Sequence, residues 1–161
     1  MNIRICSRKE IEALITNEFP PNTAVVSFYD PKSRRTPREY TPVDYQGKCN
    51  RLFAVGVHDI DIEILPEYGL TFDTYLPEAN KLARFILQAE KDGLDLICQC
   101  ECGQSRSAAC AAAVKEFFDC SGIEIFADYR YYPNQLIFNK ILAALRFESA
   151  LEKSWVPSKE I

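Results

Sequence analysis

The chain has 161 residues, 47% of them hydrophobic, and a formal net charge of −4 at pH 7. This length predicts a single domain over 1–161 with a full core, and no apolar run is long enough to span a membrane. The negative charge argues against nucleic acid or an anionic membrane as a partner. An odd number of cysteines, seven, and a start without a signal-peptide pattern favour a reducing cytoplasm over a disulfide scaffold.

Apolar and polar residues predict strands and helices in alternation. The expected strands are 2–6, 23–29, 51–57, 94–98 and a strand-like piece at 123–126, and the expected helices are 7–19, 77–91, 107–122 and 131–153. Ser7 and Glu10 predict a capping box at the first helix. Gly122 is expected to end the third helix, and Pro133 suits the first turn of the last. The alternation indicates an α/β three-layer sandwich with a mainly parallel central sheet flanked by helices.

A polar stretch over 31–50 contains a basic run at 32–38 in an otherwise acidic chain. Such runs are usually solvated loops. A basic run that folds beside an anion site would instead attract an anionic substrate.

The segment from Gln99 to Ser107 joins the 94–98 strand to an alanine-rich helix. Backbone N–H groups of a strand-to-helix turn, together with the free N–H groups of the helix start, favour an anion at one spot. Gly103 permits a positive φ or a close approach to a ligand, and Arg106 can bind two phosphate oxygens at once. The expected phosphate-binding residues are Glu101, Cys102, Gly103, Gln104, Ser105 and Arg106.

Cys100 lies at the base of this loop, where the same amides and the guanidinium would stabilise a thiolate. A thiolate in line with a bound phosphoryl group is a nucleophile, and the expected intermediate is a cysteinyl phosphate. Ser107 can hydrogen-bond the sulfur and ease its departure in the second step.

The pattern Cys-x-x-Gly-x-Ser-Arg-Ser from Cys100 to Ser107 resembles the active-site loop of the cysteine-dependent protein tyrosine phosphatases. The likeness is to their dual-specificity branch and to small bacterial-type members, and it extends more loosely over about 50–144. It implies hydrolysis of a phosphorylated protein or a small phosphomonoester, without a cofactor or a metal. The family usually has His before the cysteine, whereas Gln99 stands here; an amide can bind the loop backbone but lends no positive charge.

The mechanism also needs a proton donor for the leaving oxygen and a base for the attacking water. Related phosphatases carry an aspartate on a loop after the strand that precedes the middle helix. The resemblance therefore implies Asp59, which closely follows the 51–57 strand, with Asp61 second and Asp73 third. The spacing to the cysteine is longer than the resemblance suggests, which predicts an expanded loop over 64–69.

Several alternatives stay open. Cys98, Cys100 and Cys102 form Cys-x-Cys-x-Cys, but zinc sites favour longer spacings, and His58 is the only histidine, so no metal is expected. His58 is expected to orient the acid loop or to face solvent. A reversible disulfide from Cys100 to Cys98 or Cys102 is a redox hypothesis. A rhodanese-like sulfurtransferase would also use a cysteine in an anion-binding loop, and a catalytically weak phosphate-binding module would keep the loop without turnover.

Overall fold

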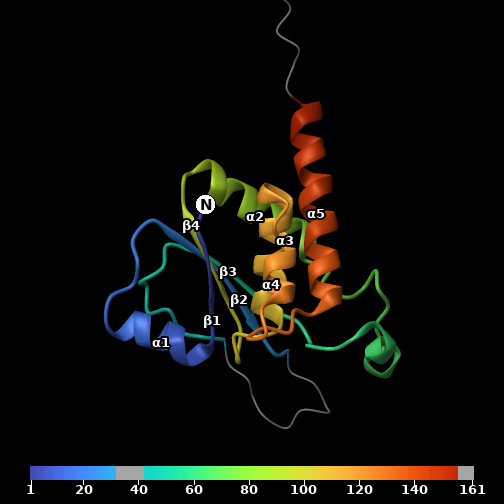
Figure 1. The fold of residues 1–161 in the computed structure, drawn as a ribbon, viewed down its shortest axis with the longest axis horizontal. Coiled ribbons are helices and arrows are strands. Elements are labelled where there is room, and N and C mark those ends of the chain that lie inside the picture. Colours follow the sequence, from blue (N-terminus) through green and yellow to red (C-terminus); the bar gives the residue numbers. More distant parts are fainter. Residues whose placement is uncertain (32–41, 156–161) are drawn as a thin grey trace, which may run out of the picture.

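A parallel sheet of four strands forms the centre of the computed structural model, which describes residues 1–31 and 42–155 (Figure 1). In spatial order the strands are β1 (Ile3–Cys6), β4 (Asp95–Gln99), β2 (Thr23–Tyr29) and β3 (Arg51–Gly56), and every neighbouring pair is parallel. All carboxyl ends therefore meet at one edge, where open α/β sheets bind ligands. The basic run at 32–38 lies outside the described residues.

Helices cover both faces of the sheet. In chain order they are α1 (Arg8–Thr16), the 3-10 helix η1 (Ile62–Tyr68), α2 (Ala79–Lys91), α3 (Arg106–Asp119), α4 (Ile123–Ala127) and α5 (Gln135–Ser154). In Figure 1, α1 lies on one side of the sheet, whereas α2, α3, α4 and α5 lie on the other. This arrangement confirms the predicted α/β sandwich with a parallel central sheet. Within the described ranges, no helix combines the length and the apolar character needed to cross a membrane.

Strand β2 shows how the sheet builds two apolar layers. Val25 packs with Ile11 of α1, whereas Val26 and Phe28 belong to the larger core under α2, α3 and α5. Successive side chains of a strand point to opposite faces, so a strand covered on both sides is apolar at most positions. The largely apolar sequence of β2 follows from this burial, and its buried polar residue Ser27 is hydrogen-bonded to Gln99.

The first helix begins as predicted, whereas the third ends differently. Ser7 N donates to Glu10 Oε2 at 2.7 Å and Glu10 N donates to Ser7 Oγ at 3.2 Å, which completes the capping box. Helix α3 ends at Cys120, which takes the left-handed conformation with φ 54°. The expectation that Gly122 ends this helix is therefore wrong, because the left-handed turn comes two residues earlier.

The strand predicted at 123–126 is wrong, because Ile123–Ala127 forms the short helix α4. An apolar run this short fits either a strand or a helix by periodicity, and tertiary contacts decide between them. Here Ile125 is buried, and Lys115 of α3 binds Glu124 at 2.7 Å. The segment therefore packs on α3 and adds no strand to the sheet.

Candidate active site

The 100–105 loop joins the end of β4 to the start of α3, as predicted. Its carbonyl groups are held from outside the loop: Arg8 N donates to Glu101 O at 3.0 Å, and Tyr132 N donates to Gln104 O at 2.9 Å. In the described part of the chain, no acceptor binds the amides of the last five loop residues. Unpaired amides in a turn that leads into a helix are suited to bind an anion.

Gly103 has a positive φ of 68°. A Cβ atom at this position would lie 2.6 Å from the backbone nitrogen of Ser7 and 2.9 Å from the carbonyl carbon of Cys6. The loop therefore packs directly on the turn between β1 and α1, and a side chain at this position would separate the two.

Cys100 lies at the base of the loop and is 2% exposed. Its Sγ is 3.0 Å from Ser107 Oγ, and its backbone nitrogen donates to Cys6 O at 3.2 Å. Ser107 is fully buried in the first turn of α3. The structure thus brings together the thiol and the hydroxyl that the sequence predicts to interact.

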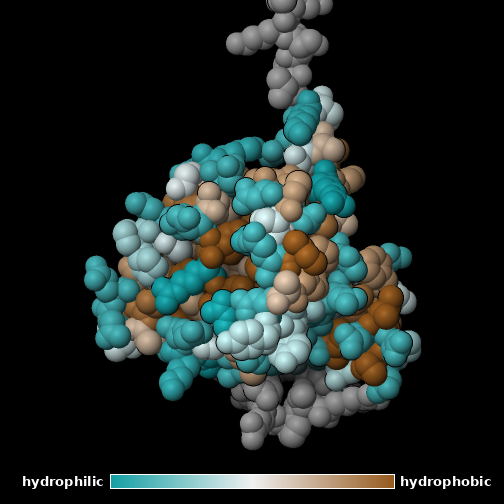
Figure 2. Space-filling view, in the orientation of Figure 1, coloured by the Kyte–Doolittle hydropathy of each residue, from teal (hydrophilic) through white to brown (hydrophobic). Residues whose placement is uncertain are grey.

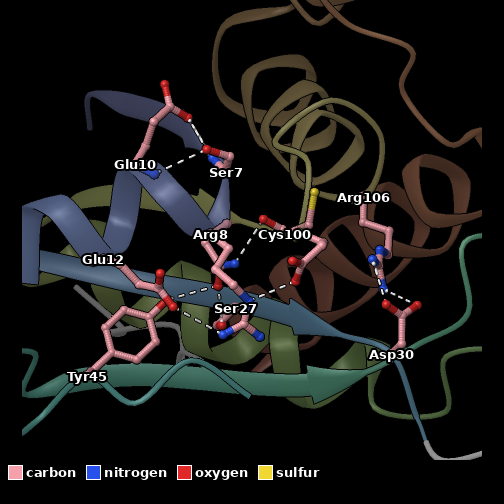
Figure 3. Close-up of polar contacts among 11 residues, drawn as sticks. Ser7, Arg8, Glu10, Glu12, Ser27, Asp30, Tyr45, Cys100 and Arg106 are labelled. Atoms are coloured by element: carbon pink, nitrogen blue, oxygen red, sulfur yellow. Dashed lines mark hydrogen bonds and ion pairs between the residues drawn. The ribbon is translucent and has the colours of Figure 1, made fainter. Parts of the chain in front are cut away.

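Arg106 begins α3 and is only 5% exposed. Its Nη1 donates to Asp30 Oδ1 at 3.0 Å, and its Nη2 reaches Asp30 Oδ2 at 3.4 Å (Figure 3). Nη1 also donates to Val57 O at 3.0 Å. Asp30 follows β2 and Val57 follows β3, so two strand ends hold the guanidinium. The Nε of Arg106 is buried and has no hydrogen-bond partner among the described residues. A buried, unpaired donor is costly, so this N–H indicates a site for an anionic acceptor.

Gln99 is buried beside the nucleophile in a neutral polar network. Its Nε2 donates to Cys100 O at 2.9 Å, and its Oε1 accepts from Tyr45 Oη at 3.1 Å and from Ser27 Oγ. Burial raises the pKa of Tyr45, so its hydroxyl remains a donor. The network ties β2 and the 42–50 segment to the backbone of the loop. Sequence reasoning foresaw that Gln99 could bind the loop backbone but had no signal for its two hydroxyl partners.

The Asp59 carboxylate contacts the far end of the 100–105 loop. Its Oδ1 accepts from Ser105 Oγ at 2.7 Å and from Asn134 Nδ2 at 2.9 Å. The same Nδ2 lies 3.0 Å from Ile60 O, and Asn134 Oδ1 accepts from Ile137 N at 3.0 Å. One asparagine therefore caps α5 and holds the segment that carries Asp59.

Asn134 is a site residue that the sequence reasoning missed. Pro133 precedes this N-cap rather than filling the first turn of α5, which corrects the expected start of the helix. An asparagine before an apolar helical pattern is an N-cap signal that the sequence contains. Its contact with Asp59 spans 75 residues, and no local pattern indicates it.

The other candidate carboxylates make no hydrogen bond to the loop among the described residues, although Asp61 lines the same hollow as Asp59 and Ser105. Asp61 is exposed at the N-cap of η1 and makes no side-chain cap bond, and Asp73 is also exposed. The expanded loop expected at 64–69 is folded for the most part as η1, in which Leu65 is buried. Of the three carboxylates, Asp59 is the one hydrogen-bonded to the 100–105 loop among the described residues.

The segment after β3 is anchored at His58, its second residue. Tyr75 Oη donates to His58 O at 2.6 Å, and the rings of His58 and Tyr68 lie 4.6 Å apart. Burial lowers the pKa of His58, with Asp30 opposing this shift and Arg106 adding to it. Of the two roles expected for His58, these contacts favour orientation of the loop.

Glu101 and Cys102 are two further loop residues that the sequence predicts to bind phosphate. Arg8 Nε binds Glu101 Oε2 at 2.8 Å, and Cys102 is exposed. The expected part of Glu101 and Cys102 in phosphate binding therefore falls to their backbone amides.

Cys98 is fully buried, and a hydrogen bond with Cys110 and burial raise its pKa well above that of an ordinary thiol. A thiol held in this form is poorly suited to resolve an oxidised Cys100. In the described ranges, no group of His, Cys, Asp and Glu side chains is arranged to hold a metal ion.

Solved structures of two proteins align with almost the whole chain. PTPMT1 in complex with PI(5)P matches with a TM-score of 0.54 and 12% sequence identity, over 94% of this chain and 94% of that one. The chain has the fold of a cysteine-based phosphatase. P. aeruginosa TpbA matches with a TM-score of 0.43 and 14% identity, over 95% of this chain and 85% of TpbA. No protein-family model and no curated protein matches the chain.

The phosphatase fold agrees with the resemblance inferred from the sequence motif. The motif lies where the parallel strands end, after an interior strand of the sheet. The fold thus places the motif at the edge of the sheet where open α/β folds bind ligands.

Proposed function

We propose that this protein is a phosphomonoester hydrolase that acts through a cysteinyl-phosphate intermediate on phosphotyrosine or other phosphoprotein substrates. The proposal rests on one arrangement at Cys100. Its Sγ lies 3.0 Å from Ser107 Oγ at the base of a loop whose following amides are unpaired within the described residues. The adjoining Arg106 has a buried Nε without a partner there. A nucleophile below a set of convergent donors suits attack on a phosphoryl group.

In the first step, the Cys100 thiolate attacks phosphorus, so that an S–P bond forms and the P–O bond to the leaving group breaks. The loop amides and Arg106 hold the three equatorial oxygens. The leaving oxygen takes a proton from a carboxylic acid, for which Asp59 is the candidate because it is hydrogen-bonded to Ser105. Both donors to this carboxylate bind Oδ1, which leaves Oδ2 to carry the proton.

In the second step, water attacks the cysteinyl phosphate. An O–P bond forms, the S–P bond breaks, and the Asp59 carboxylate takes the proton from the water. The hydroxyl of Ser107, 3.0 Å from the sulfur, stabilises the departing thiolate. Inorganic phosphate then leaves, and the thiolate and the carboxylic acid are restored.

The reaction is tested by hydrolysis of p-nitrophenyl phosphate. The wild type is expected to release p-nitrophenol, and Cys100→Ser is expected to abolish this release while the fold, followed by circular dichroism, is retained. Cys102→Ser is the matched control, because it removes an exposed thiol of the same loop. Phosphate binding without turnover by the wild type would favour a binding module, and sulfur transfer from thiosulfate to cyanide would favour a rhodanese-like enzyme.

A further inference from the structure

A groove leads away from Asp59 between the segment after β3 and the start of α5. Its inner part, of about 480 Å³, is lined by Asp59, Asp61 and Ser105 among others. Its outer part, of about 440 Å³, is lined by Asp61 and Glu63 among others. Asp61 and Gln135 line both parts, so the two parts adjoin at these side chains.

The chemistry of the proposed hydrolase places the leaving group in this groove. A general acid must lie within hydrogen-bond reach of the oxygen that it protonates. Asp59 contacts the 100–105 loop through Ser105 at 2.7 Å and also lines the inner part of the groove. With phosphate held by the loop and by the unpartnered, buried Nε of Arg106, the remainder of the substrate begins at Asp59 and continues along the groove.

The charged side chains that line the groove are all acidic within the described residues. They are Asp59, Asp61 and Glu63, and neither part of the groove is lined by lysine or arginine there. Lys140 lies beside the outer part, where its Nζ donates to Phe72 O at 2.9 Å and is 4.8 Å from the centroid of the Phe72 ring, so one cation offsets part of the negative charge of the three carboxylates. Carboxylates on the path of the leaving group attract cations and repel further anionic groups.

Exposed apolar side chains accompany these carboxylates. Ile62, Ile64 and Phe72 are 59%, 36% and 43% exposed, and all three line the groove. Figure 2 shows hydrophobic surface at the lower right, where Figure 1 places η1. An open groove with acidic and apolar walls is suited to the side chains of a peptide, whereas a substrate with several phosphates would bring more negative charge against Asp61 and Glu63.

The geometry points to a phosphorylated peptide segment with a lysine or arginine beside the phosphorylated residue as the substrate, in preference to a polyanionic inositol phosphate or phosphoinositide. This inference rests on the proposed hydrolase activity and names its substrate class. The flanking cation reaches Asp61 and Glu63, and apolar flanking residues cover Ile62 and Ile64.

The test compares kcat/KM for phosphotyrosine peptides that differ only in the flanking positions, which carry Lys, Gln or Glu. One exposed ion pair contributes a few tenths to one kcal/mol, so two pairs predict a Lys-to-Glu ratio of about 10. The ratio should fall as the ionic strength rises. Glu63→Lys should lower the ratio at least ~3-fold, whereas Asp119→Lys, an equal charge reversal at the exposed far end of α3 and outside the groove, should leave it unchanged.

Equal rates for the three peptides would overturn the inference, as would a ratio that Glu63→Lys does not change. A higher kcat/KM for a soluble inositol phosphate than for the Lys peptide would also overturn it. The ratio is internal to each variant, so a general loss of activity or stability does not imitate the effect. Failure of the hydrolase proposal is recognised separately, by the lack of Cys100-dependent hydrolysis of p-nitrophenyl phosphate.

Discussion

Gln99 Nε2 donates a hydrogen bond of 2.9 Å to the carbonyl oxygen of Cys100. Two hydroxyls fix the other end of the amide, because Ser27 and Tyr45 both donate to Gln99 Oε1. The backbone of the candidate nucleophile is therefore positioned by a buried neutral group. The family that the motif resembles usually has a histidine at this place, whereas Gln99 lends the loop no positive charge.

Gln99→Leu should lower the free energy of unfolding by about 1–3 kcal/mol, because it leaves buried hydroxyls of Ser27 and Tyr45 without their acceptor. Urea unfolding measures the change, and phosphatase activity should fall with it. Gln88→Leu is the control, since Gln88 is exposed on α2, and its effect should stay within ~0.5 kcal/mol. Equal effects of the two substitutions would mean that the buried network contributes no stability.

Gly103→Ala should destabilise the loop and weaken phosphate binding. The added Cβ would meet backbone atoms of Ser7 and Cys6 at 2.6 Å and 2.9 Å, in addition to the strain of a positive φ. We expect a loss of about 2–4 kcal/mol by chemical denaturation, part of it from backbone strain. Gly47→Ala separates the two causes, because Gly47 has φ 69° but no atom of the described residues lies within 4 Å of its would-be Cβ. If both substitutions cost the same, the contact with the β1–α1 turn contributes nothing.

Asp59→Asn should lower kcat about 10²- to 10⁴-fold, because general acid–base catalysis supplies a factor of this size. Asp61→Asn should have a much smaller effect on p-nitrophenyl phosphate, since its carboxylate makes no contact with the loop among the bonds of the described residues. Steady-state rates at several pH values make the comparison. The reverse order of the two variants would assign the proton transfer to Asp61.

Asn134→Ser should lower kcat while the melting temperature stays close to that of the wild type. Serine caps a helix about as well as asparagine, but its shorter side chain loses the bond to Asp59 Oδ1, which measures 2.9 Å in the native protein. Asn134→Ala removes both the cap and the bond, so it should lower stability as well, by about 1 kcal/mol. Unchanged kcat in the serine variant would show that Asn134 serves only as a cap.

The protein should lose stability as the pH rises above about 8.5, the ordinary pKa of a thiol. The hydrogen bond with Cys110 and burial raise the pKa of Cys98, so the folded state keeps a proton that the unfolded state releases. This contribution is complete below the unfolded pKa and is lost as the pH approaches the folded one, by up to about 1.4 kcal/mol per pH unit.

Urea unfolding between pH 7 and pH 10 measures this slope. Cys98→Ala should make it shallower, whereas Cys120→Ala, which removes an exposed thiol, should leave it as in the wild type. Identical slopes in all three proteins would assign the alkaline loss to other groups, such as the buried hydroxyls of Tyr45 and Tyr75, whose pKa values are also raised by burial.

Much of the fold follows from periodicity, because long amphipathic or fully buried segments fit one kind of element. The boundaries of β2 agree with the prediction at both ends, and the capping box places the start of α1. The short run at 123–126 is different, because four residues are too few for periodicity to distinguish a strand from a helix. Contact with α3 makes this segment helical.

The sequence alone determined the local arrangement at the centre of the candidate site, because strand, turn and helix follow one another without interruption. Their spacing is enough to place Cys100 below a turn, with Arg106 and Ser107 in the first turn of the next helix. These relationships depend on local backbone geometry, which neighbouring residues specify.

Only the tertiary structure decided which distant groups meet that loop. It brought Asp30 to Arg106 across 76 residues, Tyr45 to Gln99 across 54, and Asp59 to Ser105 across 46. Parallel strands end at the same edge of the sheet, so the segments that follow them become neighbours there. Which side chain of each segment makes the contact depends on strand register and side-chain packing, and no spacing within a single segment contains that information.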